Sequence, residues 1–344
     1  MKRIVIVSED LAPPWDRETA KFAWSVGRVL AMKYDVRLIN VDRNGTGGEN
    51  EKIRRVPGTR TFMTPSLRRE IRSFTPDTVL YVPSSSSTTG SFVRAYALRR
   101  HAPRAAHGMV ALIPRRHRAA ERPILHGTAP DVLFVGSYRS LLHTHLLSLN
   151  GDLIPAGVDA SAYRPPRAGE RVALRETLGV EAGSYVYLHV GRVGPRRNLD
   201  RLAALAETPG ASVIVVAVDP PADQRLQSRL ERAGVRVVHG PVPVAEYYRA
   251  ADCYVFPVED HGEEGEIPLG VFEALASGVP VVSTPFGGLR DFLPPGDDLR
   301  YIESDDELLA AVSQLREQAA PAVRSMDDFS WERVAQRIVK TLGP

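Results

Sequence analysis

Short runs of β-branched and other apolar residues alternate with longer segments of helical periodicity along the whole chain. In the first half we expect strands at 3–8, 36–41, 78–82, 109–113 and 132–135. In the second half we expect strands at 185–190, 213–218, 235–238, 253–256 and 281–283. Such a βαβα succession is typical of parallel sheets with helices on both faces. The pattern therefore predicts an α/β fold with two Rossmann-like domains facing a central cleft.

Helical segments mark the two ends of this arrangement. Residues 16–32 carry apolar side chains on one stripe, and Asp16 is a suitable N-cap for them. A last helix opens at Trp331, and we expect it to return to the N-terminal domain. The predicted organisation is an N-terminal domain at 1–155 together with a helix at about 326–344, a proline-containing linker at 156–170, and a C-terminal domain at 171–325.

Composition narrows the class of protein. The chain has 43% hydrophobic and 25% charged residues, as globular proteins do. No apolar run approaches the roughly 18 residues that a membrane-spanning helix needs. The first strand is also too short for a signal peptide, and the single cysteine, Cys253, excludes an internal disulfide. We therefore expect a cytoplasmic protein, either free or peripherally associated with the inner membrane face.

The net charge of +3 is unevenly distributed. Residues 1–165 hold 25 Lys and Arg against 14 Asp and Glu, whereas residues 166–344 hold 19 against 27. A basic half attracts phosphates, nucleic acid or anionic lipid. An arginine-rich composition that reflects coding bias explains the same counts. The asymmetry is consistent with two units and with an anionic partner for the first of them.

The segment 263–282 predicts an anion site. Pro268 suits the first turn of a helix because it has no N–H to leave unpaired, and Gly278 can end that helix in a left-handed conformation. The first N–H groups of the helix, at Leu269 and Gly270, would face an anion. Glu273, one turn further in, could receive sugar or ribose hydroxyls. This layout suits a nucleotide sugar.

A second candidate element follows the strand at 185–190. Gly191 allows the backbone to approach a ligand closely, and Arg192 and Arg197 could converge on a diphosphate. The carboxyl ends of strands in open α/β sheets are where ligands bind, so this turn would border the cleft. Arginines that are merely solvated in a βα loop are the alternative reading.

These motifs together resemble those of family 4 glycosyltransferases. The Gly-Arg pair at 191–192 with Pro-Arg-Arg-Asn-Leu after it resembles the family's phosphate loop, and Glu273-Ala-Leu-Ala-Ser-Gly-Val-Pro resembles its Glu-x7-Glu region. Further similarities lie at 153–165, at 247–257 and at 286–288. The motifs span about 150–300, and the first 140 residues resemble the family only in architecture, which is called GT-B.

The resemblance implies specific roles for the C-terminal half. Arg192 and Arg197 would neutralise the donor diphosphate, with Arg197 standing where the family usually has lysine. Glu273 would contact the ribose, and the N–H groups of Leu269 and Gly270 would meet the β-phosphate. Family members usually retain the anomeric configuration and need no metal or other cofactor; UDP- or GDP-linked donors are the common ones.

Two departures from the family pattern affect the site. Gly265 occupies the position of the family's first glutamate, with Glu264 and Glu266 on either side. We expect Glu266 to contact the donor sugar and to act in catalysis together with Arg192 and Arg197; the alternative is that it only favours the helix dipole. In place of the usual glycine pair after the first strand stands 12–18, where Trp15 and Arg17 could contact an acceptor, although a structural tryptophan fits equally well.

A functional histidine is also not evident. Many relatives place one at the end of the strand at 109–113, where this chain has Leu-Ile-Pro-Arg-Arg. His107 and His117 lie nearby, but a surface histidine is the simpler reading for each. The hydroxyls at 84–89 could serve instead.

The sequence therefore predicts a hexosyl-type glycosyltransferase that moves a sugar from a nucleotide diphosphate to an unidentified hydroxyl-bearing acceptor, with retention of configuration. A non-catalytic nucleotide-sugar or glycan-binding protein of the same fold is the alternative. A nicotinamide-dependent oxidoreductase is disfavoured because no Gly-x-Gly-x-x-Gly follows either first strand. No recognised nucleic-acid-binding module is present, whereas a peripheral contact with an anionic membrane is compatible with the basic half.

Overall fold

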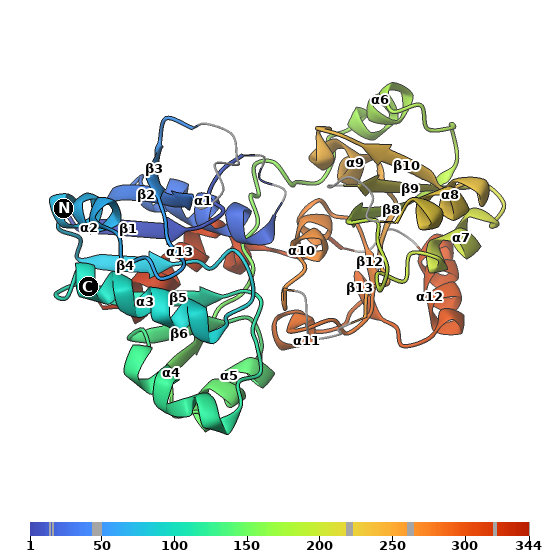
Figure 1. Cartoon of the computed structure of the whole chain (residues 1–344). Coiled ribbons are helices and arrows are strands. Elements are labelled where there is room, and N and C mark those ends of the chain that lie inside the picture. The colour runs from blue at the N-terminus through green and yellow to red at the C-terminus, as the bar shows by residue number, and fades with distance from the viewer. Residues whose placement is uncertain are drawn as a thin grey trace. The chain divides into compact units, whose positions relative to one another are not determined.

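The computed structural model describes residues 1–13, 15, 17–42, 50–217, 223–259, 265–318 and 322–343. These residues form two compact units (Figure 1). The first unit comprises residues 1–157, 265–267 and 331–343, and the second comprises 158–259 and 268–330. Of the linker predicted at 156–170, residues 156–157 belong to the first unit and residues 158–170 to the second. Asp16, the predicted N-cap, lies outside the described residues.

The first unit is built on a parallel sheet with the order β3-β2-β1-β4-β5-β6-β7. Its strands are β1 (Arg3–Ser8), β2 (Asp35–Asp42), β3 (Ile53–Pro57), β4 (Thr78–Tyr81), β5 (Ala106–Ala111), β6 (Val132–Val135) and β7 (Gly151–Leu153). Its helices are α1 (Glu18–Leu30), α2 (Pro65–Phe74), α3 (Thr89–His101), η1 (Ala119–Glu121), α4 (Arg122–Thr128), α5 (Tyr138–Leu146) and α13 (Trp331–Thr341).

Both faces of this sheet are buried. Val5 and Val7 of β1 point into a core with α2, α3 and α4, whereas Ile6, on the opposite face, lies near Gly27 of α1. The last helix, α13, belongs to this unit, as expected, and Trp331 packs edge-on against Phe22 with ring centroids 5.6 Å apart. Apolar residues on both faces explain why the strands read as continuous apolar runs.

The second unit repeats the plan with the order β10-β9-β8-β11-β12-β13, again all parallel. Its strands are β8 (Tyr185–Gly191), β9 (Ala211–Ala217), β10 (Arg236–His239), β11 (Cys253–Phe256), β12 (Val281–Ser283) and β13 (Leu299–Tyr301). Its helices are α6 (Glu170–Thr177), α7 (Arg201–Ala206), α8 (Gln224–Arg232), α9 (Val244–Ala250), α10 (Leu269–Ala276), α11 (Leu289–Phe292), α12 (Asp305–Glu317) and η2 (Asp327–Phe329).

Two parallel sheets with helices on both faces confirm the predicted pair of Rossmann-like domains. Tyr187, Val213 and Val255 form one core with α7, α8 and α12, and the buried residues of α9 and α10 cover the other face. Within the described ranges, no helix is both long enough and apolar enough to cross a bilayer.

Candidate functional site

The second sheet reverses its strand order between β8 and β11. From β8 the chain continues to β9 on one side, while β11 pairs with β8 on the other side. The helices that follow two such strands lie on opposite faces, which leaves a crevice at the carboxyl ends of the strands. Gly191 is the last residue of β8. The predicted Gly-Arg turn therefore begins at the point where open α/β sheets bind ligands.

Gly191 is enclosed by two nitrogen-bearing side chains. A Cβ at this position would lie 3.0 Å from His189 Nε2 and 3.2 Å from Arg197 Nη2. The Arg197 guanidinium carbon also lies 6.0 Å from the centroid of the Phe256 ring, at the end of β11. Arg192 follows Gly191 directly and is exposed. Both arginines of the predicted phosphate loop thus belong to one turn at the switch point.

His189 is a feature of this turn that the sequence interpretation missed. The ring is fully buried, and Nδ1 lies 2.9 Å from the carbonyl oxygen of Val255, so Nδ1 donates its proton there. Nε2 is buried and has no hydrogen-bond partner within the described parts of the chain. Burial, with a smaller contribution from the Arg197 charge, lowers the pKa of His189 to about 4. The imidazole is therefore neutral at pH 7, with a bare lone pair on Nε2 facing Gly191.

Helix α10 brings the predicted anion-binding N–H groups to this unit. Pro268 is the N-cap residue rather than a residue of the first turn, and Leu269 and Gly270 begin the helix. At the other end, Gly278 has a φ of 69°, and its N–H bonds the Leu275 carbonyl, while the Val279 N–H bonds that of Ala274. This pair of bonds is a Schellman motif, which fixes where the helix stops.

Gly270 has a steric role as well. A Cβ there would collide with the Tyr254 hydroxyl and would lie 3.0 Å from that of Tyr248. The Tyr254 hydroxyl donates to the carbonyl oxygen of Val190 at 3.2 Å. The first turn of α10 thus lies against a tyrosine that is tied to the end of β8, which links the two predicted motifs through the packing of the second unit.

Glu273 is 5% exposed and lies among tyrosines. The Tyr163 hydroxyl is hydrogen-bonded to it, and the rings of Tyr163 and Tyr248 meet edge to face at 5.6 Å. Burial and then the Glu273 charge raise the pKa of the Tyr163 and Tyr254 hydroxyls above the ordinary range. Both hydroxyls stay protonated, and that of Tyr163 can hold the Glu273 carboxylate in a fixed orientation, whereas that of Tyr254 donates to the Val190 carbonyl.

Glu266 belongs to the first unit, whereas Gly191 belongs to the second. Its Oε1 accepts hydrogen bonds from Ser137 Oγ at 2.7 Å and from Ser140 Oγ at 2.5 Å, and its N–H donates to the Leu112 carbonyl. Ser137 is the N-cap of α5. A carboxylate near a helix N-terminus is stabilised by the helix dipole. The donor-sugar contact proposed for Glu266 stays a prediction.

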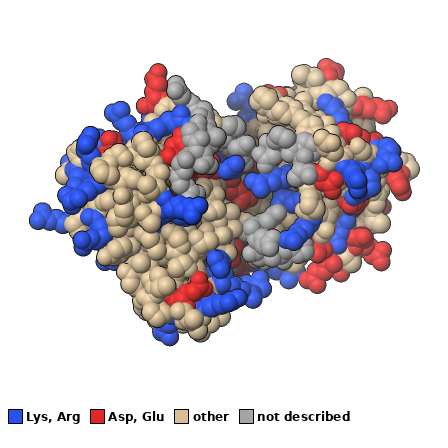
Figure 2. Space-filling model, viewed as in Figure 1, with Lys and Arg blue, Asp and Glu red and all other residues tan. Residues whose placement is uncertain are grey.

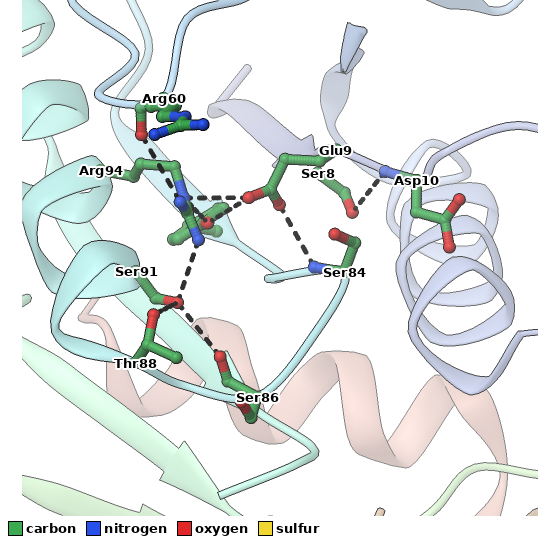
Figure 3. A network of polar contacts seen from close by, with 10 residues as sticks. Ser8, Glu9, Asp10, Arg60, Ser84, Ser86, Thr88, Ser91 and Arg94 are labelled. Atoms are coloured by element: carbon green, nitrogen blue, oxygen red, sulfur yellow. Dashed lines mark hydrogen bonds and ion pairs between the residues drawn. The ribbon is translucent and has the colours of Figure 1, made fainter. Parts of the chain in front are cut away.

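The first sheet has its own switch point between β1 and β4, and a buried polar network occupies it (Figure 3). Arg94 Nε of α3 lies 2.9 Å from Glu9 Oε1, which also accepts from the Tyr81 hydroxyl at 2.8 Å. The Ser84 N–H donates to Glu9 Oε2 at 3.2 Å, and Arg94 Nη2 donates to Ser91 Oγ at 3.1 Å. The network fixes the serine-rich loop after β4.

The two residues predicted to contact the acceptor, Trp15 and Arg17, follow Glu9 of this network closely in the sequence. Trp15 stacks on Trp24 with ring centroids 4.6 Å apart, and Arg17 Nη1 donates to Asp10 Oδ2 at 3.0 Å. The stacking gives Trp15 a structural contact, and its acceptor role remains a prediction.

The two histidines near β5 are both buried rather than on the surface. His107 Nε2 lies 2.8 Å from the Ala102 carbonyl oxygen, within the core. His117 Nε2 lies 2.8 Å from the Ser87 carbonyl oxygen, and His117 lines a small cavity with Ser87, Arg115, Ser140, His143 and Thr144. His117 is therefore the one of the two that borders free space.

Residues 184–318 match the family described as glycosyl transferases group 1. Two relatives are D-inositol 3-phosphate glycosyltransferases: that of Segniliparus rotundus is 31% identical over 216 residues, which is 55% of this chain and 45% of the relative, and that of Geodermatophilus obscurus is 34% identical over 218 residues, which is 54% and 46%. The chain spans about half the length of the curated relatives it matches.

Solved structures share the fold over nearly the whole chain. Anabaena HepE in complex with UDP-glucose aligns with a TM-score of 0.71 at 16% identity, covering 99% of each chain. Sucrose-phosphate synthase from Thermosynechococcus elongatus aligns with a TM-score of 0.72 at 16% identity, covering 98% of this chain and 97% of that one. Residues 184–318 thus match the group 1 glycosyl transferases, and the chain shares the two-domain GT-B architecture of these solved structures.

Proposed function

We propose that the chain transfers a hexosyl group from a nucleotide diphosphate sugar to a hydroxyl-bearing acceptor, with retention of configuration. The observation that supports this most directly is the turn at the switch point of the second sheet. There Arg192 and Arg197 flank Gly191, within the segment that matches the family. Two guanidinium groups beside a glycine turn suit a diphosphate, whose oxygens they can pair bidentately.

Donor binding is proposed to use three elements of the second unit. Arg192 and Arg197 would balance the diphosphate charge, the N–H groups of Leu269 and Gly270 would receive the β-phosphate, and Glu273 would accept ribose hydroxyls. The hydrogen bond from the Tyr163 hydroxyl supports the last role because it holds the Glu273 carboxylate in place before the ligand arrives. UDP is the favoured nucleotide, since solved structures of Anabaena HepE contain UDP and UDP-glucose.

The chemistry needs stabilisation of a leaving group. As the bond between the sugar and the diphosphate breaks, negative charge grows on the diphosphate, and preplaced arginines and helix N–H groups lower the energy of that state. Glu266 would act at the sugar. No metal or cofactor is part of the proposal. Within the described residues, no cluster of three His, Cys, Asp or Glu side chains could hold a metal ion.

The acceptor is proposed to bind the first unit, at the carboxyl ends of β1, β4 and β5. The loop fixed by Glu9 and Arg94 and the cavity beside His117 lie at that edge. An acceptor that carries phosphate fits the basic half of the chain. It also fits the relatives, which are named D-inositol 3-phosphate glycosyltransferases. The expected peripheral contact with an anionic membrane remains part of the proposal, as does a cytoplasmic location.

A panel of nucleotide diphosphates and their sugars tests the donor proposal by thermal shift and by release of free nucleotide. We expect one nucleotide to raise the melting temperature, and its sugar to be hydrolysed or transferred. Arg192→Ala and Arg197→Ala should each lower turnover by about 10²-fold, which is typical for removal of one donor to a developing anion. Arg232→Ala, an exposed arginine on α8, is the matched control and should leave turnover unchanged.

Three outcomes separate the alternatives. Protection from melting without hydrolysis or transfer would identify the non-catalytic binding protein instead. Turnover that stays near normal in both Arg192→Ala and Arg197→Ala would refute the assigned phosphate loop. Absence of any shift across the whole panel would refute nucleotide-sugar binding itself.

A further inference from the structure

Four apolar side chains are exposed on two neighbouring helices of the first unit. On α5, Tyr138, Leu142 and Leu146 are 59%, 61% and 69% exposed, and on α4, Ile124 is 51% exposed. Residues four apart on a helix lie on one face, so the three residues of α5 form a stripe along its outer side. Large exposed apolar groups that gather in this way usually mark an interaction surface.

Helices α4 and α5 lie side by side in the first unit (Figure 1), and side-chain contacts hold them together. His126 Nε2 of α4 lies 2.7 Å from the Leu147 carbonyl oxygen at the end of α5, and Arg122 is hydrogen-bonded to Ser148. The loop before α4 is attached as well, because the His117 N–H donates to His143 Nε2 at 3.1 Å. A fixed platform, rather than a single helix, carries the apolar groups.

The platform is also basic. Residues 114–146 contain five arginines, at 115, 116, 118, 122 and 139, against two acidic residues. Both carboxylates are engaged locally: Glu121 accepts from the Arg118 N–H and the Thr89 hydroxyl, and Asp131 pairs with Arg99. Figure 2 shows Lys and Arg beside a largely uncharged expanse in the part of the first unit where α4 and α5 lie. The charge that remains is positive.

We propose that the α4–α5 platform, defined by Ile124, Tyr138, Leu142 and Leu146 with the arginines at 115–122, docks the first unit on an anionic lipid bilayer. This inference rests on the membrane contact proposed above and assigns it to a surface. Leucine and isoleucine suit shallow insertion between lipids, and tyrosine suits the interface because its ring is apolar and its hydroxyl is polar. Arginines around such groups add attraction to anionic headgroups. A neutral apolar partner would leave these charges uncompensated, which is why an anionic surface is favoured.

Co-sedimentation with vesicles tests this proposal without any need for a donor or acceptor. The full chain should bind phosphatidylglycerol vesicles and bind phosphatidylcholine vesicles at least about tenfold more weakly, with the difference shrinking as salt screens the charges. The double variant Leu142→Ser/Leu146→Ser should lose at least about tenfold in binding, from the transfer of two leucines. Arg116→Gln/Arg118→Gln should lose about 25-fold, at about fivefold for each arginine near an anionic surface.

Matched variants separate this surface from general effects of charge and hydrophobicity. Val172→Ser removes a side chain that is 63% exposed on α6 of the second unit, and Arg68→Gln/Arg69→Gln removes two exposed arginines from α2. Both should bind vesicles as the parent chain does. The nucleotide-induced thermal shift should be the same in all variants, so a failure of the donor proposal would be seen separately.

Several results would overturn the proposal. One is a parent chain that does not bind phosphatidylglycerol vesicles in 0.1 M salt. Another is binding that Leu142→Ser/Leu146→Ser leaves intact. A dimer in light scattering that this double variant converts to a monomer would assign the platform to a second copy of the chain instead.

Discussion

The dependence of stability on pH tests the electrostatics of the turn at Gly191, because His189 is buried there. The ring is buried beside Arg197, and its pKa is lowered from 6.5 to about 4, chiefly by burial. In the unfolded chain the same imidazole takes up a proton near its ordinary pKa. Between pH 6.5 and about 4 the unfolded state therefore binds more protons than the folded state. Stability contributed by the neutral ring is complete above this window and is lost as the pH falls through it.

The size of the effect follows from the two pKa values. The difference between 6.5 and about 4 corresponds to about 3 kcal/mol at about 1.36 kcal/mol for each pKa unit. Burial also lowers the pKa of His101, His107 and His143, so acidification destabilises the fold at those sites too. Comparing the parent chain with a variant at position 189 isolates the contribution of His189, because the other three histidines are present in both proteins.

His189→Asn is the suitable variant because its side-chain amide can still donate to the Val255 carbonyl but does not titrate. Urea denaturation at pH 7 and pH 4.5 measures the free energy of unfolding of both proteins. We expect the parent chain to lose more stability than the variant, by up to about 3 kcal/mol. His239→Asn, at an exposed histidine, should behave like the parent. Equal losses in parent and His189→Asn, or an NMR titration of His189 near pH 6.5, would refute the reasoning.

Two further predictions concern packing. Gly270→Ala should destabilise the fold by about 1–3 kcal/mol, since its Cβ would collide with the Tyr254 hydroxyl. Gly127→Ala, which meets nothing within 4 Å in α4, should instead be neutral or stabilising by up to about 1 kcal/mol; thermal denaturation distinguishes them, and similar losses in both would contradict this account. Glu9→Ala or Arg94→Ala should each lower the free energy of unfolding by about 3–5 kcal/mol, because each leaves the buried charge of the other residue without its partner. Glu9→Ala/Arg94→Ala should lose clearly less than the sum of the single variants in urea denaturation, and an additive loss would show that the pair is not coupled.

Local patterns were sufficient for most of the fold. The predicted strands at 3–8, 132–135, 253–256 and 281–283 have these bounds in the structure, because each is a short apolar run that is buried on both faces. The strands β3, β7 and β13 were not predicted. Each lies at or next to an edge of its sheet, where fewer faces are buried and the apolar signal is weak. The strand predicted at 109–113 begins earlier, at Ala106, since its start is set by pairing with β4.

The residues of the candidate site also differ in whether the sequence could reveal them. Gly191, Arg192, Arg197 and Glu273 stand in contiguous motifs that a single sequence can reveal. The polar His189 within the apolar run 186–190 was a visible signal that the sequence interpretation did not use. The Glu9–Arg94 pair gave no such signal, since its members are 85 positions apart in the chain.

The sequence by itself determined two parallel α/β units, the turn at Gly191 and the helix that carries Glu273. Periodicity and short motifs determine such features because their causes are local, as the positive φ of Gly278 shows. Tertiary structure alone decided what surrounds them: the tyrosines around Glu273, the bare Nε2 of His189 and the serines that bind Glu266. The parallel strands bring these side chains together from distant segments, and no local pattern encodes which segments will meet.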